Sequence, residues 1–266
     1  MRANRVLDDA VADGIVAGTG LFRRSDRTSG PVRPPSEEPM SETYSVRELR
    51  RMWKPHKLQL AQTERGAATN IRFHRACSWL QKAEEADETF PDFALVGRWI
   101  AFNALYGKWD DTRREPQPDL AGWRAFVDRM VHLDANEHVA AILQTHKRLV
   151  QAILDDEYLS AYFWEDPTPH RAKRSKKGKH QSHTWYLNRQ WTMILDKVLE
   201  RIYLLRCQLV HGAATCGGRL NRTSVRLCNT MLDHLLRTFL LIWVESGAEE
   251  DWGALCYPPI DKQRPR

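Results

Sequence analysis

An arginine and a histidine five residues apart, Arg206 and His211, stand at the end of a long apolar pattern and directly before Gly212. Histidine titrates near neutral pH and can carry protons to and from oxygen atoms. A guanidinium binds phosphate through two parallel hydrogen bonds and stabilises negative charge that develops on it. The pair therefore suits RNA cleavage by attack of the 2′-hydroxyl, which needs no metal ion, and we take both as candidate catalytic residues.

The pattern around Arg206 predicts where both side chains lie. Apolar residues recur at helical spacing through 191–209, and Arg206 follows Ile202 by four, so it lies on or beside the inward face. A charged guanidinium there needs a carboxylate, a phosphate or cleft water. Five helical residues turn about 500°, which leaves Arg206 and His211 about 140° apart. Glycine accepts the left-handed C-cap conformation, so Gly212 should end the helix and leave His211 at its tip.

A structural explanation of the pair remains open at this point. Arg206 would then be a buried arginine paired to a carboxylate, and His211 would cap helix carbonyls. The sequence holds a second pair at the same spacing, Arg51 and His56, but Pro55 lies inside it and we interpret that pair as a chance match.

Three polar or thiol side chains are candidate cleft residues beside the pair. They are Asn103, Cys207 and Gln208. For Asn103, a satisfied buried amide is the competing interpretation.

The net charge of +6 has a local origin in the segment 170–183, HRAKRSKKGKHQSH, which contains six basic residues and no acid. We expect a loop there that contacts RNA phosphates, with a solvated insertion as the alternative. Trp185 and Tyr186 follow the segment and either stack on bases or belong to the core. Its histidines do not have the spacing of a common metal site, so we expect no metal. The candidate RNA-binding residues are Arg171, Lys173, Arg174, Lys176, Lys177 and Lys179.

The rest of the chain predicts helices, because apolar residues recur at spacings of three and four and no run of five residues alternates with period two. Helical patterning begins at SVRELRRMW and again after Pro55, Asn136 is a candidate N-cap, and a short aromatic helix is expected in EYLSAYFW. An all-α antiparallel bundle follows. The expected longer helices are 57–88, 92–109, 119–132, 137–154, 184–211 and 222–246.

Two stretches resemble a known family. RIYLLRCQLVHG, followed by a short turn and a final helix, resembles the signature of HEPN domains, a helical family that includes many prokaryotic toxin and defence ribonucleases. FALVGRWIAFNALYGKW is similar to the second helix of some HEPN subfamilies. The resemblance covers about 60–248 and implies an HEPN-like bundle with additional helices.

For the site, the resemblance implies that Arg206 and His211 are the catalytic pair of a metal-independent endoribonuclease without a cofactor. It also implies a homodimer that shares one cleft, a role as a toxin or anti-phage effector, and a cognate antitoxin such as a nucleotidyltransferase. The family often has Asn, Asp or His directly after the arginine, whereas this chain has Cys207. That difference favours the alternative, a catalytically inactive HEPN-like module that binds RNA or a partner protein.

The composition of the remaining segments predicts where the folded domain begins and ends. Residues 1–43 are rich in Arg, Ser, Pro and Gly and are expected to be disordered, 44–248 to form the helical domain, and 249–266 to be a C-terminal tail. Five cysteines without a C-x-x-C pair argue against a disulfide framework and a zinc site. The sequence shows no apolar signal segment and no run long enough to span a membrane, so we expect a soluble cytoplasmic protein.

Overall fold

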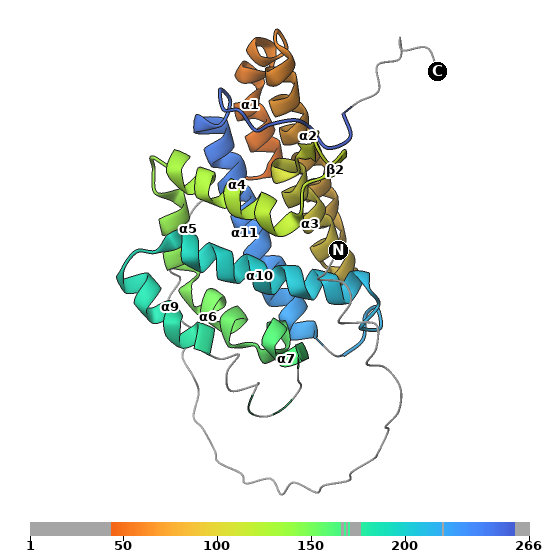
Figure 1. Ribbon diagram of the computed structural model, residues 1–266, viewed down its shortest axis with the longest axis vertical. Coiled ribbons are helices and arrows are strands. Elements are labelled where there is room, and N and C mark those ends of the chain that lie inside the picture. Colours follow the sequence, from red (N-terminus) through yellow and green to blue (C-terminus); the bar gives the residue numbers. More distant parts are fainter. Residues whose placement is uncertain (1–43, 166–167, 169, 171–176, 220, 259–266) are drawn as a thin grey trace, which may run out of the picture. The chain divides into compact units, whose positions relative to one another are not determined.

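The computed structural model describes residues 44–165, 168, 170, 177–219 and 221–258, and these form an all-α domain, as predicted. The prediction for residues 1–43 lies outside the described part. Figure 1 shows the arrangement of the helices. Their bounds are α1 (Val46–Leu60), α2 (Glu64–Ala86), α3 (Pro91–Tyr106), α4 (Asp119–Leu133), α5 (His138–Thr145), α6 (Lys147–Asp155), α7 (Ala161–Glu165), α9 (Lys177–Leu187), α10 (Trp191–Val210) and α11 (Arg222–Ser246), with a single 3₁₀ turn, η1 (Glu157–Leu159).

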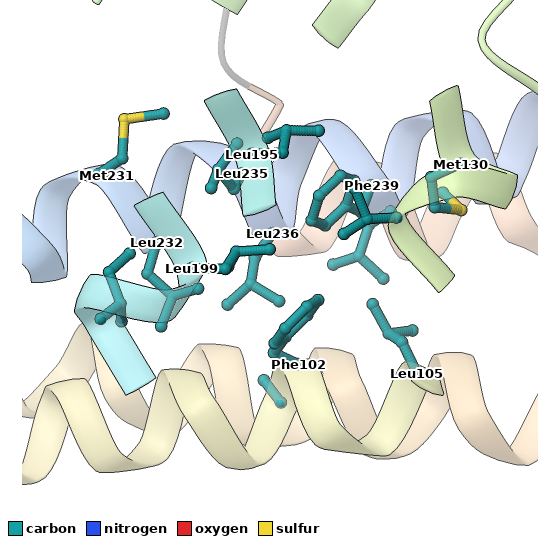
Figure 2. Packing of buried hydrophobic residues seen from close by; sticks show 14 of the residues in the cluster. Phe102, Leu105, Met130, Leu195, Leu199, Met231, Leu232, Leu235, Leu236 and Phe239 are labelled. Atoms are coloured by element: carbon teal, nitrogen blue, oxygen red, sulfur yellow. The ribbon is translucent and has the colours of Figure 1, made fainter. Parts of the chain in front are cut away.

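The core is built around α11, which is buried along most of its length and packs against α3 and α10 (Figure 2). It is the one described helix that is long and apolar enough to cross a membrane, and 67% of its most apolar window is buried inside the domain. That burial is typical of the core helix of a soluble protein. Helices α2 and α3 approach closely at Gly97, where an added Cβ would lie 3.3 Å from the Cβ of Ala83.

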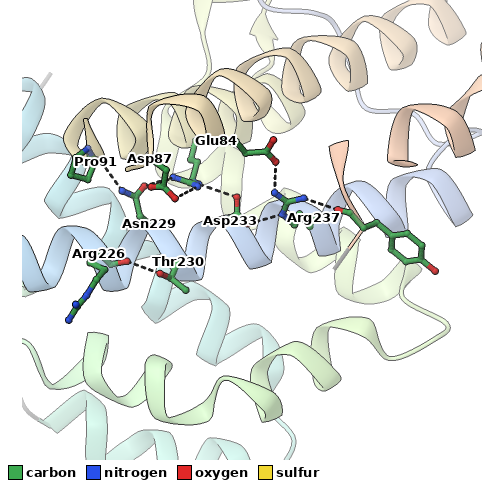
Figure 3. A network of polar contacts seen from close by, with 10 residues as sticks. Glu84, Asp87, Pro91, Arg226, Asn229, Thr230, Asp233 and Arg237 are labelled. Carbon is green, nitrogen blue, oxygen red and sulfur yellow. Dashed lines mark hydrogen bonds and ion pairs between the residues drawn. The ribbon is translucent and has the colours of Figure 1, made fainter. Parts of the chain in front are cut away.

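A buried polar network ties α2, α3 and α11 together (Figure 3). The guanidinium of Arg98, 2% exposed, donates two hydrogen bonds of 2.9 Å to the carboxylate of Asp87, one of 2.9 Å to Asn229 and one of 3.2 Å to Asp233. Arg237 donates to the other oxygen of Asp233 at 2.7 Å. Since a buried guanidinium needs anionic partners, this network fixes the register of α3 against α11.

Two helix boundaries differ from the sequence prediction near the amino end. Helix α1 begins at Val46 as the pattern predicts but continues through Pro55 to Leu60 without the expected interruption, and the single predicted helix 57–88 is divided between α1 and α2. The division occurs at Thr63, whose side chain accepts a hydrogen bond of 3.0 Å from the backbone N–H of Gly66 and caps α2.

The predicted helix 137–154 is also divided, at His146 between α5 and α6, and Asn136 is not its cap. The N-cap residue is Glu137, and the carboxylate of Asp134 accepts hydrogen bonds from the backbone N–H groups of His138 and Val139 at 2.9 and 2.8 Å. The side chain of Asn136 instead donates to Glu245.

The predicted loop 170–183 is helical from Lys177 onward, because α9 begins there and continues to Leu187. Lysine and glutamine are good helix formers, so charge alone was a poor indicator of a loop. The predicted helix 184–211 is therefore divided between α9 and α10 near Arg189, whose φ is 52°.

The helical domain does not end at residue 248, since part of the predicted tail packs on it. Trp252 is 3% exposed and stacks on Trp243 with ring centroids 4.1 Å apart. Arg72, 1% exposed, donates hydrogen bonds to the carbonyls of Ala254 at 2.9 Å and Gly107 at 2.5 Å. This arginine joins the C-terminal segment to a short hairpin that follows α3, formed by β1 (Trp109–Asp110) and β2 (Glu115–Pro116).

Candidate functional site

Gly212 ends α10 as predicted. Its φ is 70°, its N–H donates to the carbonyl of Leu209 at 3.2 Å, and the N–H of Ala213 donates to the carbonyl of Gln208 at 2.8 Å. These two bonds form the Schellman arrangement, which satisfies carbonyls that the helix end leaves unpaired. His211 is the C-cap residue, so it lies at the tip of the helix.

Arg206 is partly buried on the face of α10 that turns toward α3 and α4. Its Nη1 lies 3.9 Å from the sulfur of Cys207, and its guanidinium lies 5.9 Å from the ring centre of Tyr203. Among the described residues no carboxylate pairs with it. Asp119, a nearby acid, accepts a hydrogen bond of 3.0 Å from the hydroxyl of Tyr106 instead. The carboxylate pairing that the structural explanation of Arg206 requires is therefore not found in the described part of the chain.

The residues that surround Arg206 are aromatic and partly buried. Tyr203 packs on Trp99 of α3 with ring centroids 5.5 Å apart. Burial, with the neighbouring Cys207 thiol, raises the pKa of Tyr203 to about 12, so its hydroxyl stays protonated. Arg206 is thus a cation held between a neutral phenol and a thiol, which leaves its charge available to an anion.

His211 is exposed, and its imidazole makes no hydrogen bond or ion pair to another described residue. The capping explanation also fails for the side chain, since it is the backbone N–H of His211 that donates to the carbonyl of Cys207 at 2.9 Å. Because α10 continues as a helix to Val210, the two candidate side chains remain on different sides of it. One chain does not bring them into contact.

The remaining cleft candidates have different surroundings. Asn103 is partly buried and its amide bonds no other described residue, so it is not the satisfied buried amide that was the alternative. Cys207 is a free thiol beside Arg206. Gln208 donates to the carbonyl of Tyr158 at 2.9 Å and accepts from Asn221 at 3.4 Å, so it links α10 to η1 and to the start of α11.

The candidate RNA-binding residues are only partly described. Arg171, Lys173, Arg174 and Lys176 lie outside the described residues. Lys179 pairs with Asp155 of α6 at 2.8 Å, which reduces the charge that it offers to a phosphate. Of the two alternatives for the next aromatics, the core position holds for Tyr186, which is buried and donates its hydroxyl to the carbonyl of Leu143. Its partly buried neighbour Trp185 packs against the core.

One residue near the pair was missed by sequence reasoning. Asp92, at the start of α3, accepts a hydrogen bond of 2.9 Å from the backbone N–H of Gly217 and pairs with Arg222. Burial raises its pKa, but the bonds from Arg222 and Gly217 outweigh burial and the net pKa is lowered. It thereby fastens the turn after His211 to α3. An acid after a helix-starting proline is common, so the sequence carried no specific signal.

Comparison with protein-family models, curated proteins and solved structures finds no match to this chain.

Proposed function

We propose that this chain is a metal-independent endoribonuclease of the HEPN type. The observation that carries the proposal is the partly buried guanidinium of Arg206, which has no carboxylate partner among the described residues and lies five residues before an exposed histidine. Partly buried charges are normally paired, so an unpaired arginine on an aromatic face is suited to a phosphate that arrives with a ligand.

The proposed reaction is a transesterification within the RNA. The 2′-oxygen attacks the adjacent phosphorus, the bond from phosphorus to the 5′-oxygen breaks, and the products are a 2′,3′-cyclic phosphate and a 5′-hydroxyl. The imidazole of His211 transfers the proton that leaves the 2′-hydroxyl or reaches the 5′-oxygen. Arg206 binds the non-bridging oxygens, on which negative charge increases.

The active form that we propose is a homodimer, since one chain keeps Arg206 and His211 on different sides of α10. The outer face of α3 carries exposed or partly exposed apolar residues at helical spacing, Phe93, Val96 and Ile100, and Phe93 is 63% exposed. Val210, at the end of α10, is 53% exposed. A two-fold contact through these apolar residues would bury them and place two copies of the pair in one cleft.

The test is incubation of purified protein with labelled RNA in EDTA. We expect cleavage to persist, the new ends to be 2′,3′-cyclic phosphates, and a 2′-deoxy substitution at the scissile nucleotide to abolish the reaction. Activity that appears only after Mg²⁺ or Mn²⁺ is added would exclude this chemistry. The biological role that we propose is that of a cytoplasmic toxin or anti-phage effector, with an antitoxin such as a nucleotidyltransferase as partner.

A second candidate function is a catalytically silent module that binds RNA or a protein. The contact between the Cys207 thiol and Arg206 favours it, because a thiol is a weak hydrogen-bonding group at a position where HEPN domains often carry a polar side chain. RNA binding without cleavage in the same assay would select this alternative.

A further inference from the structure

Three aromatic side chains form a cluster beside Gln208, near the end of α10. Tyr158 of η1 packs edge-on against Phe163 of α7, with ring centroids 5.0 Å apart, and Phe163 packs edge-on against Trp164 at 5.2 Å. The indole N–H of Trp164 donates to the carbonyl of Tyr158 at 2.8 Å, which fixes the outer ring in place. We call Tyr158, Phe163 and Trp164 the aromatic platform.

The platform leaves large apolar surfaces in contact with solvent. Tyr158 is 47% and Trp164 is 42% exposed, although the other large aromatics of the domain include four fully buried tryptophans. Rings held by edge-on contacts and a backbone hydrogen bond lose little conformational freedom when a ligand stacks on them. The platform is therefore preorganised for a flat partner.

The aromatic platform lies close to the candidate catalytic histidine in the fold. Gln208, three residues before His211 and on the same side of α10, donates to the Tyr158 carbonyl that also accepts from Trp164. The turn η1, which carries Tyr158, packs against both α7 and α10. A chain that lies across the platform consequently passes close to His211.

Charge near the platform favours a polyanion. Arg219, in the turn after His211, is exposed and has no ion-pair partner among the described residues, and Arg206 has none either. Helix α9, which carries Lys179 of the basic segment, approaches the same region, where Gly178 lies beside the carbonyl of Leu154.

We propose that the aromatic platform is a nucleobase-stacking site for single-stranded RNA, on which Trp164 and Tyr158 hold bases that flank the cleaved bond while basic residues bind the phosphates. This inference rests on the proposed function for its choice of RNA. Every base has a π-face, so such a site accepts many sequences and requires unpaired bases. It predicts a ribonuclease that prefers single-stranded segments to duplex RNA.

The experiment compares Trp164→Ala with Trp79→Ala, a matched control on α2 whose tryptophan is 45% exposed. The probe is a short labelled single-stranded 2′-O-methyl RNA, which cannot undergo 2′-hydroxyl attack, alongside an abasic oligomer of the same length and charge. Binding is measured by fluorescence anisotropy. We expect Trp164→Ala to weaken binding of the base-containing probe about tenfold, Trp79→Ala to leave it unchanged, Trp164→Phe to restore most of it, and all proteins to bind the abasic probe equally.

Several results would overturn the inference. Wild-type affinity in Trp164→Ala would do so, as would an equal loss of affinity for the abasic probe. A change in self-association by light scattering with RNA affinity unchanged would show that the platform contacts protein instead. Cleavage in EDTA is measured separately. Cleavage by a protein whose RNA binding does not depend on Trp164 would exclude the stacking site but not the proposed catalysis. Binding that depends on Trp164, without any cleavage, would exclude the catalysis but not the stacking site.

Discussion

At the scale of single residues, Arg206 and His211 make few contacts that would stabilise the fold, so their removal should affect chemistry more than folding. We predict that Arg206→Ala and His211→Ala each lower the cleavage rate by a factor of about 100 or more, since each removes a charge-stabilising or proton-transferring group. The melting temperature should stay close to that of the unmodified chain, because no ion pair of a described residue is lost. Product analysis and thermal melting check both parts.

The control for this pair is Arg51→Ala on the exposed surface of α1, at the other R-x4-H spacing in the sequence. It should leave both cleavage and stability unchanged. If Arg206→Ala instead unfolds the protein, the arginine has a structural role and the assignment of a phosphate-binding role to it is wrong.

At the scale of the elements, the Arg98 network should be a principal determinant of how α3 packs on α11. Replacing Arg98 by Met removes four hydrogen bonds and leaves Asn229 and one oxygen of Asp233 without their donor inside the domain. We expect the free energy of unfolding to fall by about 3 kcal/mol, measured by urea denaturation. Arg124→Ala is the control: its pair with Asp196 is on the surface, with 44% of the arginine side chain exposed, so its loss should cost about 1 kcal/mol or less.

A second prediction at this scale concerns the junction between α5 and α6, where His146 stacks on His234 of α11 with ring centroids 4.0 Å apart. Burial, together with His146, lowers the pKa of His234 from 6.5 to about 4, and burial lowers the pKa of His146 too. Of the charged groups near His234, Asp233 opposes this shift, while Arg237 and Arg98 add to it. Both imidazoles are therefore neutral in the folded protein at neutral pH.

The sign of the pH effect follows from these pKa values. The unfolded chain takes up protons at these histidines below about pH 6.5, while the folded chain resists protonation of His234 until about pH 4. Stability should thus be full above pH 6.5 and decline as the pH falls toward 4. We expect His234→Phe to flatten this decline in thermal melts, and His180→Phe, on an exposed site of α9, to leave it unchanged. A His234→Phe protein that loses stability with acid as steeply as the original would contradict this account.

The elements also show what could be predicted from the sequence. The long apolar patterns of α3, α4 and α11 and the cap at Gly212 follow from local chemistry, and all were predicted within a few residues. The breaks inside the predicted helices, at Thr63, His146 and Arg189, were not, because many polar residues of the same types lie inside helices without ending them. Local pattern carries no information about which polar side chain finds a partner.

The candidate site illustrates the same limit over longer distances. The spacing of Arg206 and His211 and their placement at a helix end were available from the sequence. The roles of Asp92 and of the aromatic platform depend on contacts between residues far apart in the chain, 125 positions from Asp92 to Gly217 and 50 from Tyr158 to Gln208. Only the folded arrangement of α3, η1 and α10 brings these groups to the same region.

At the scale of the whole molecule, the separation of Arg206 from His211 within one chain predicts that activity depends on assembly. Placing a charge on the apolar face of α3, as in Phe93→Glu, should dissociate the proposed dimer and abolish cleavage while the helical content stays the same. Leu58→Glu on α1 is the matched control, because Leu58 is 77% exposed and lies away from that face. Light scattering measures the mass, and a fully active monomer of 30.9 kDa would exclude the shared site.

Mixing inactive variants tests which chain supplies each group. If a working site combines Arg206 of one chain with His211 of its partner, a heterodimer of Arg206→Ala and His211→Ala chains contains one site with both groups intact. About half of the dimers are heterodimers after random exchange of equal amounts, and each has one of its two sites restored, so roughly a quarter of the original activity should return. If each chain uses its own pair, every site in the heterodimer lacks one group and no activity returns. Exchange is verified with two distinguishable tags, so that absence of recovery assigns the pair to a single chain.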